Sequence, residues 1–377
     1  MKRQITLLLL LFVSMTLNLQ AATWTVSNNP SSPGQYTNLQ TAIDAAAIND
    51  TIMVAGSATS YGNISFGKRL VLVGAGYHNP YGNNSTLGNV TLYRTNLYIG
   101  ASGSKIMGFI ITGNTYLTGS FSGSNSTTAL CSNIVFERCQ ILSSFYFFYS
   151  TGSPYLEQLF KNDTIRNCII SGTVYFASYN TSGHGHFKDI YIHNNIFNGI
   201  TSTNSSPFIN FEGYNPTDFT NINIRNNVFI NKLYSCFGSL SNMIIENNIF
   251  YAAEPQGGTG CVLTKNLTFM CLNNNIPGTG NLGSGNIINA NPLFVNYPLA
   301  GGVGFSYTYD FHLQHPASPG YNAGTDGSDI GIYGGWAPFE VGANPYFPQM
   351  MELTLPNGSS VPAGGTLNVH FKARKQN

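Results

Sequence analysis

The stretch DIYIHNNIF (residues 189–197) decides the fold of this chain, because four other stretches repeat its pattern without a gap. These are NIVFERCQI (133–141), NDTIRNCII (162–170), NINIRNNVF (221–229) and NMIIENNIF (242–250), and a degenerate sixth begins near Asn266. The apolar anchors of the five stretches are 29, 27, 32 and 21 residues apart: Phe136, Ile165, Ile192, Ile224 and Ile245. Self-similarity at such a period indicates a solenoid in which each repeat forms one turn.

Each repeat holds three short segments that alternate between apolar and polar residues. An apolar–x–apolar segment is followed by a two-residue polar corner and a second apolar pair. An aromatic-rich segment then follows, at residues 145–148, 174–176, 208–211 and 234–237. Alternation at period two is typical of a strand with one buried face. The strands of one repeat cannot close a sheet, whereas stacked turns give each strand a parallel neighbour on either side. The sequence therefore predicts an all-β fold, a right-handed parallel β-helix with three short strands per coil.

The polar corners carry Asn pairs at residues 194–195, 226–227 and 247–248. Asn tolerates the left-handed backbone conformation of a sharp bend, and its amide can bond the backbone. Stacked Asn side chains can also bond one another from coil to coil. In the two earlier repeats, Cys139 and Cys168 take the second corner position, where we expect an inward column with the two thiols stacked and reduced; a disulfide is the alternative.

The ends of the chain have a different texture. Residues 36–47 have the apolar stripe of a short amphipathic helix that Thr37 or Asn38 can cap, and we expect it to cover the first coil. Residues 349–377 alternate around a Pro-Asn-Gly turn and indicate a β-hairpin or two late strands. The expected organisation is a signal peptide (1–22), a β-helix domain (23–345) and C-terminal strands with a tail (346–377).

The signal peptide is predicted from the N-terminus. Lys2 and Arg3 precede an apolar run at residues 5–13, and Ala21 and Ala22 offer a small-residue cleavage point. The run is too short to span a bilayer. We therefore expect a protein that is secreted or held at the cell surface, with no membrane insertion after cleavage.

Charge limits the classes of partner. Only 8% of residues are charged and the formal net charge is +1, which gives no electrostatic footprint for nucleic acid. A hydrophobic content of 42% is enough to build a large core. We expect a monomer whose partner is a polysaccharide or cell-surface glycan.

The chain also resembles a known family. The stretches DTIMVA (50–55) and KRLVLVGAG (68–76) look like the N-terminal cap and first coil of pectin-lyase-like β-helix proteins. NPLFV (291–295), DFHLQ (310–314) and DIG (329–331), with Ser318-Pro319 and Asn322-Ala-Gly324, resemble the last coils of secreted bacterial members. The resemblance implies the same fold. It leaves the reaction open, because such folds include lyases, hydrolases, esterases, epimerases and non-enzymes.

Alignment of the repeats creates one column of outward residues on adjacent coils. It contains Glu137, Arg166, His193, Arg225 and Glu246. On one interpretation, opposite charges in this column merely support each other. On the other, the column binds sugar, and the predicted ligand-binding residues are Glu137, Arg166, Tyr191, His193, Arg225 and Glu246. Two arginines that flank a histidine could also neutralise a uronate carboxylate and take its α-proton, so the catalytic candidates are Arg166, His193 and Arg225.

Other candidate sites are weaker. Asp326 and Asp329 form a close acidic pair in a Gly-rich loop, where a turn role is favoured over calcium. His184, His186 and His193 could bind a metal only if a continuous strand placed them on one face. We expect no metal or other cofactor. Exposed rings could stack on sugars or pack beneath loops, the candidates being Tyr146, Tyr175, Tyr179, Tyr191 and Tyr234.

Three functions remain open. The scarcity of acid–base groups favours a secreted β-helix protein that binds polysaccharide. The clustered basic residues favour a polysaccharide lyase or hydrolase, although matched carboxylates are missing. A structural or adhesive surface protein would use the repeats only for length.

Overall fold

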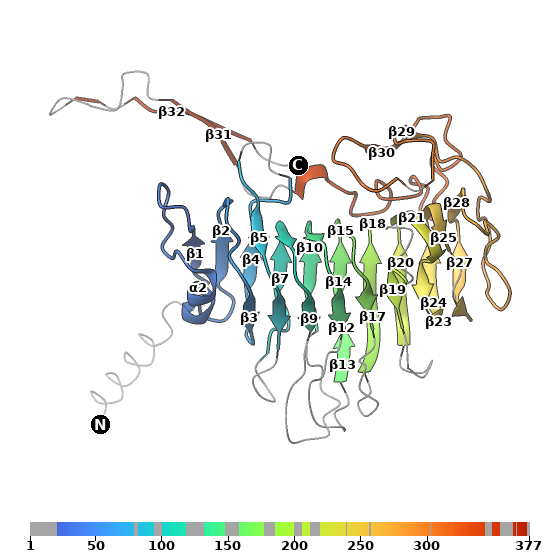
Figure 1. The fold of residues 1–377 in the computed structure, drawn as a ribbon, viewed down its shortest axis with the longest axis horizontal. Helices are drawn as coiled ribbons and strands as arrows, with labels where there is room; N and C mark the ends of the chain where they lie inside the picture. Colours follow the sequence, from blue (N-terminus) through green and yellow to red (C-terminus); the bar gives the residue numbers. More distant parts are fainter. Residues whose placement is uncertain are drawn as a thin grey trace, which may run out of the picture.

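The computed structural model describes residues 21–78, 82–93, 100–117, 132–147, 158–176, 185–199, 206–211, 219–238, 240–255, 258–301, 303–343, 349–354, 365–366 and 368–374. Stacked coils form a parallel β-helix with three parallel sheets running along its length (Figure 1). The predicted fold class is therefore confirmed. Nearly all of the predicted signal peptide, residues 1–20, lies outside the described residues. Within them, no helix is both long enough and apolar enough to cross a membrane.

Three sheets contain the strands of the coils. The first sheet consists of β1 (Thr23–Val26), β2 (Thr51–Val54), β4 (Val71–Val73), β7 (Lys105–Met107), β10 (Val135–Glu137), β14 (Thr164–Arg166), β17 (Gly185–His193), β20 (Phe219–Arg225), β24 (Met243–Glu246) and β27 (Val262–Thr264), with β13 (Gln158–Lys161) paired to β17. The second consists of β5 (Ser85–Leu87), β8 (Phe109–Ile111), β11 (Gln140–Ile141), β15 (Ile169–Ile170), β18 (Ile196–Asn198), β21 (Val228–Ser235), β25 (Ile249–Glu254) and β28 (Leu267–Phe269). The third consists of β3 (Ile64–Phe66), β6 (Val90–Leu92), β9 (Thr115–Leu117), β12 (Phe145–Phe147), β16 (Val174–Tyr175), β19 (Ile209–Asn210) and β22 (Phe237–Gly238).

The register of the first sheet matches the alignment of the repeats. The anchors Phe136, Ile165, Ile192, Ile224 and Ile245 are consecutive cross-strand partners from β10 to β24. All five are buried. Because register follows which face of each strand is apolar, the period-two pattern was sufficient to fix it.

Aromatic side chains stack inside the coils along the axis of the solenoid. Phe147, Phe176 and Phe211 form one stack, with successive ring centroids 4.6 and 4.3 Å apart. Phe197, Phe229 and Phe250 form another. Such offset pairs add about 0.5–1.5 kcal/mol beyond the area they bury. Rings at equivalent positions of adjacent coils therefore stabilise the contact between those coils.

A buried ladder of Asn side chains lines the corner between the first and second sheets. Asn227 accepts hydrogen bonds from the backbone N–H and the Nδ2 of Asn195, and its own Nδ2 donates to Asn248 Oδ1 and to the Ile192 carbonyl. The pattern continues from Asn248 to Asn266. The expected Asn stacking is confirmed, and the later coils contribute one rung each.

Cysteines replace asparagine at the start of this column. Cys139 and Cys168 are fully buried, and the Cys139 backbone N–H donates to the Cys168 Sγ over 3.4 Å. Both are free thiols, as are Cys236, Cys261 and Cys271. Burial raises the pKa of the Cys168 thiol well above its usual value. The expected reduced, stacked pair is what the structure contains; Cys131 lies outside the described residues.

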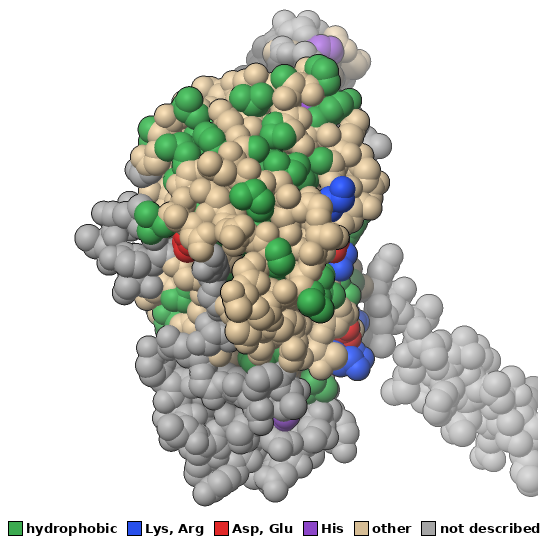
Figure 2. All heavy atoms as spheres, turned by 90° about the vertical axis from the view of Figure 1, so that its right-hand side faces the viewer, with side chains coloured by type: hydrophobic (Ala, Val, Ile, Leu, Met, Phe, Trp, Pro, Cys, Tyr) green, Lys and Arg blue, Asp and Glu red, His purple; other side chains and the backbone are tan. Residues whose placement is uncertain are grey.

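A helix covers the first coil, as predicted. Helix α2 (Leu39–Ala45) is shorter than the expected residues 36–47 and is capped by Asn38, whose Oδ1 accepts from the Thr41 N–H. The helix buries Leu39, Ala42 and Ile43 against the solenoid. The opposite end of the solenoid shows scattered hydrophobic side chains among uncharged polar ones (Figure 2). Leu282, which is 72% exposed, pairs there with Val262 of β27.

The chain then turns back along the solenoid. The antiparallel pair β29 (Phe294–Asn296) and β30 (Asp310–Leu313) leads into residues 325–343, here called the return segment, which runs from the last coils towards the first (Figure 1). Two short strands, β23 (Leu240–Ser241) and β26 (Gly258–Thr259), pair beside the late coils. The predicted C-terminal hairpin is present as β31 (Gln349–Thr354) and β32 (His370–Arg374).

Candidate functional site

The corner residues that precede the Asn ladder hold the return segment against the coils. They are in the left-handed conformation, with φ between 51° and 57°, at Arg138, Asn167, Asn194, Asn226 and Asn247. Asn247 bonds Thr325, Asn194 donates to the carbonyls of Ile332 and Gly334, and Asn167 donates to those of Ala337 and Pro338. The return segment is therefore fixed at successive coils along the column of charged residues.

The charged column has the predicted register. Glu137, Arg166, His193, Arg225 and Glu246 are consecutive cross-strand partners in the first sheet. Arg166 bonds Glu137 over 3.0 Å, and Arg225 bonds Glu246 over 3.1 Å. The expectation that opposite charges in the column support each other is confirmed.

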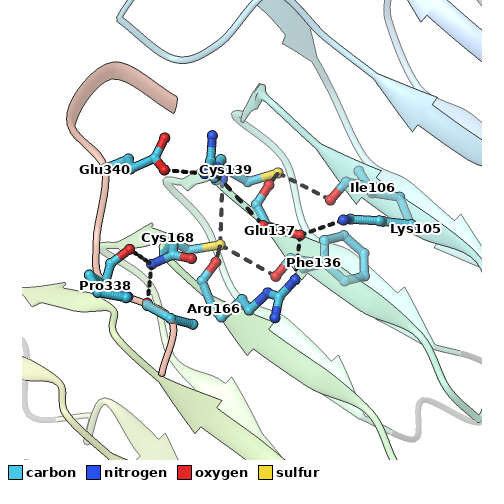
Figure 3. A network of polar contacts seen from close by, with 12 residues as sticks. Lys105, Ile106, Phe136, Glu137, Cys139, Arg166, Cys168, Pro338 and Glu340 are labelled. Atoms are coloured by element: carbon cyan, nitrogen blue, oxygen red, sulfur yellow. Dashed lines mark hydrogen bonds and ion pairs between the residues drawn. The ribbon is translucent and has the colours of Figure 1, made fainter. Parts of the chain in front are cut away.

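Glu137 is not a surface residue. Its side chain is 0% exposed and lies close to Lys105 Nζ at 2.6 Å, Arg166 at 3.0 Å and Arg138 Nε at 3.7 Å (Figure 3). Arg138, 2% exposed, also pairs with Glu340 of the return segment over 2.7 Å. The prediction that Glu137 contributes to an open binding face is therefore wrong, because its side chain is fully buried among neighbouring cations.

A pocket of about 430 Å³ remains between the return segment and the later part of the column. Its lining consists of Thr164, Tyr191, His193, Asn194, Asn223, Arg225, Asn226, Glu246, Asn247, Thr325, Asp326, Gly335 and Trp336. Four predicted binding residues are thus brought together: Tyr191, His193, Arg225 and Glu246. Glu137 and Arg166 lie outside the lining.

Trp336 forms one wall of the pocket and is a site residue that the sequence did not predict. Its side chain is 75% exposed, although its ring lies 4.8 Å from that of His193. The Arg166 guanidinium lies 5.4 Å from the indole centroid, a cation–π distance. An exposed Trp beside hydrogen-bonding groups is a common recognition element. The signal available in the sequence was a Trp in the Gly-rich stretch GIYGGWAPFE (331–340).

The hydrogen bonds of Asn194 determine the tautomer of His193. Asn194 Nδ2 donates to two carbonyls of the return segment, so its Oδ1 is the atom that faces His193 Nδ1, 2.8 Å away. Nδ1 must therefore carry the proton, since Oδ1 can only accept. The other nitrogen, Nε2, is a lone-pair acceptor and has no hydrogen-bond partner among the described residues.

His193 is held neutral. It is 4% exposed, and burial lowers its pKa to about 4, an effect that the nearby Arg166 and Arg225 reinforce while the Asn194 hydrogen bond opposes it. A base with so low a pKa is poorly matched to removing a proton at neutral pH. The ring is better suited to accepting a hydrogen bond.

The acidic groups in the pocket, Glu246 and Asp326, and the nearby Asp329 already have hydrogen-bond or ion-pair partners. Glu246 accepts from the Thr325 hydroxyl as well as from Arg225. Asp326 accepts from the backbone and hydroxyl of Ser328, which lowers the Asp326 pKa. Asp329 accepts from the Asn322 N–H and bonds His315. These local contacts are of the kind expected for residues in turns.

The remaining candidate residues fall elsewhere. Tyr146 is stacked between Tyr116 and Tyr175, with centroids 5.2 and 4.9 Å away, so it presents an edge rather than a ring face. Tyr179, His184 and the side chain of Tyr234 lie outside the described residues. Within the described part of the chain, no three His, Cys, Asp or Glu side chains cluster as metal ligands would.

The solved structures that resemble this chain do so only weakly. No family model and no curated protein sequence matches the chain. Among solved structures, a pectin methylesterase from carrot is similar over 73% of this chain and 90% of its own, with 13% identity and a TM-score of 0.32. A deglycosylated pectin methylesterase from Aspergillus niger is similar over 71% and 87%, with 16% identity and a TM-score of 0.22.

Proposed function

We propose that this protein is exported and binds polysaccharide in the pocket between the return segment and the coils. The observation that carries the proposal is the exposed indole of Trp336 above His193, with Tyr191 and Arg225 in the same pocket. Sugars present apolar C–H faces that stack on aromatic rings and hydroxyls that bond polar groups. A volume of about 430 Å³ lies within the usual range of small-ligand sites.

The pocket is also rigidly built, which favours binding. Asn194, Asn226 and Asn247 line it and fasten the return segment at the same time. Side chains that are already fixed lose little conformational entropy when a ligand arrives. The proposal therefore assigns these residues a positioning role.

Catalysis receives less support from the same geometry. A lyase acting through Arg166, His193 and Arg225 needs free cations and a competent base. Each arginine instead bonds a carboxylate, and the His193 pKa is about 4. A purely structural role would not explain why the Trp336 ring is exposed beside hydrogen-bonding groups.

The test is to incubate the protein with a panel of neutral and acidic polysaccharides, with and without calcium. Unsaturated products are followed by ultraviolet absorbance, and retention is followed on immobilised glycans. Retention without products is expected. Unsaturated products would replace the proposal with a lyase, and the absence of both signals across the panel would favour the structural role.

A further inference from the structure

The pocket contains two unsatisfied hydrogen-bonding atoms of opposite kind. His193 Nε2 is an acceptor, and Arg225 Nε–H is a donor; both are buried and have no hydrogen-bond partner among the described residues. Buried polar atoms are nearly always paired in folded proteins, and an unpaired one calls for an explanation. Because His193 and Arg225 line the same pocket, a bound ligand could supply the missing hydrogen-bond partner of each atom.

We propose that the pocket recognises a neutral sugar residue, whose hydroxyls donate to Nε2 of His193 and accept from Nε of Arg225. This inference rests on the proposed function and adds the class of glycan. A hydroxyl group is both donor and acceptor, so it can serve either atom. An ionised carboxylate can only accept hydrogen bonds, so it would place its lone pairs against the lone pair of His193 Nε2. An ammonium group can only donate hydrogen bonds, so the Arg225 guanidinium would repel it and could not bond it.

The charges around the pocket point the same way. Arg225 is the cation in its lining, and it is balanced by Glu246 at 3.1 Å, while Asp326 adds a further carboxylate. Arg166, beside the pocket, bonds the buried Glu137. His193 is neutral at physiological pH. A uronate would therefore enter a site whose nearest positive charges already have partners, and whose lining has an excess of negative charge.

The pocket also has an apolar wall. Trp336 leaves most of its ring surface open to solvent while one part packs against His193. A sugar that stacks on this indole lies next to the imidazole. Stacking and hydroxyl bonding need no charge on the ligand, so the affinity should depend little on salt.

Isothermal titration at pH 7 tests the class of ligand. The probes are oligosaccharides of matched length from xylan, galactan and β-glucan, from polygalacturonate, and from chitosan. We expect at least one neutral oligosaccharide to bind at least tenfold more tightly than the acidic and amino probes, with little change between 50 and 500 mM salt. Tighter or equal binding of the acidic or amino probe would overturn the inference while leaving glycan binding intact. No binding by any probe would instead overturn the proposed function.

Two variants separate recognition from folding. Arg225→Lys keeps the charge that pairs with Glu246 but removes the Nε donor, and should weaken the neutral oligosaccharide about tenfold. Glu246→Gln removes the carboxylate that competes for Arg225. If the natural ligand is neutral, this variant should not convert the site into one that prefers polygalacturonate. Thermal unfolding of both variants checks that the fold is retained, and an unchanged affinity in a folded Arg225→Lys protein would contradict the assigned contact.

Discussion

Arg138 and Glu340, far apart in the sequence, form an ion pair of 2.7 Å that ties the return segment to the coils (Figure 3). The Arg138 side chain is almost fully buried and also lies near Glu137. The pair marks the end of a series of corner contacts that begins at Asn247 and Thr325. The corner residues that turn these coils thus also hold the return segment, which forms one wall of the candidate site.

Replacement of Glu137 should be more costly than replacement of Glu340. Glu137→Gln leaves three cations around a fully buried neutral side chain, and loss of one partner from a buried charge cluster costs about 3–5 kcal/mol. Glu340 is 36% exposed, so Glu340→Gln should cost about 1 kcal/mol. Urea unfolding measures both. Equal costs would show that the Glu137 cluster contributes no more than a surface pair.

The Asn ladder should be essential to stability. Asn227→Ala removes an acceptor for two groups of Asn195 and a donor to two further acceptors, all buried. Orphaned buried groups cost about 1–3 kcal/mol each, so a loss of at least 3 kcal/mol is expected. The control is Asn63→Ala, since the exposed Asn63 accepts a single backbone bond from Asn89. Comparable melting temperatures of the two variants would refute the importance of the ladder.

Asp163 should be a site where removing a carboxylate stabilises the protein. It is fully buried, one oxygen accepts from the Ile134 N–H, and burial raises its pKa well above 3.8. The unfolded state therefore loses the proton first, so stability falls as pH rises from about 3.8 towards the folded pKa. Asp163→Asn keeps the acceptor and removes this cost. The melting temperature of the variant should exceed that of the parent at pH 7–8, and the gain should vanish near pH 4; a loss at pH 8 would contradict the assignment.

His193 should make stability fall in mild acid. Its folded pKa is about 4, against 6.5 for an unperturbed histidine, so between these values the unfolded state binds the extra proton. This stability is present above pH 6.5 and is lost as pH falls towards 4, by about 3 kcal/mol. His193→Gln should flatten that part of the stability profile. Parallel profiles for the parent and His193→Gln would show that His193 is not held neutral.

The fold could be predicted from the sequence because its determinants are local. Alternation at period two sets which face of each strand is buried, and the Asn pairs encode left-handed corners. The register of Phe136, Ile165 and Ile192 followed directly from these patterns.

The site could be predicted only in part, because one wall comes from a distant segment. The column of Arg225 and Glu246 was visible as a repeat position, and both residues line the pocket. The pairing of Arg138 with Glu340 and the placement of Trp336 depend on the path of the return segment, which has no repeat pattern. Contacts between residues far apart in the chain set that path.

The most direct test of glycan binding in the pocket compares Trp336→Ala with Leu282→Ala on immobilised neutral polysaccharide. Both residues are highly exposed, at 75% and 72%, but Leu282 lies at the end of the solenoid, outside the pocket lining. Trp336→Ala should weaken retention at least tenfold at an unchanged melting temperature, while Leu282→Ala should bind as the parent does. Equal retention of both variants would contradict the claim that the pocket under the return segment is the binding site.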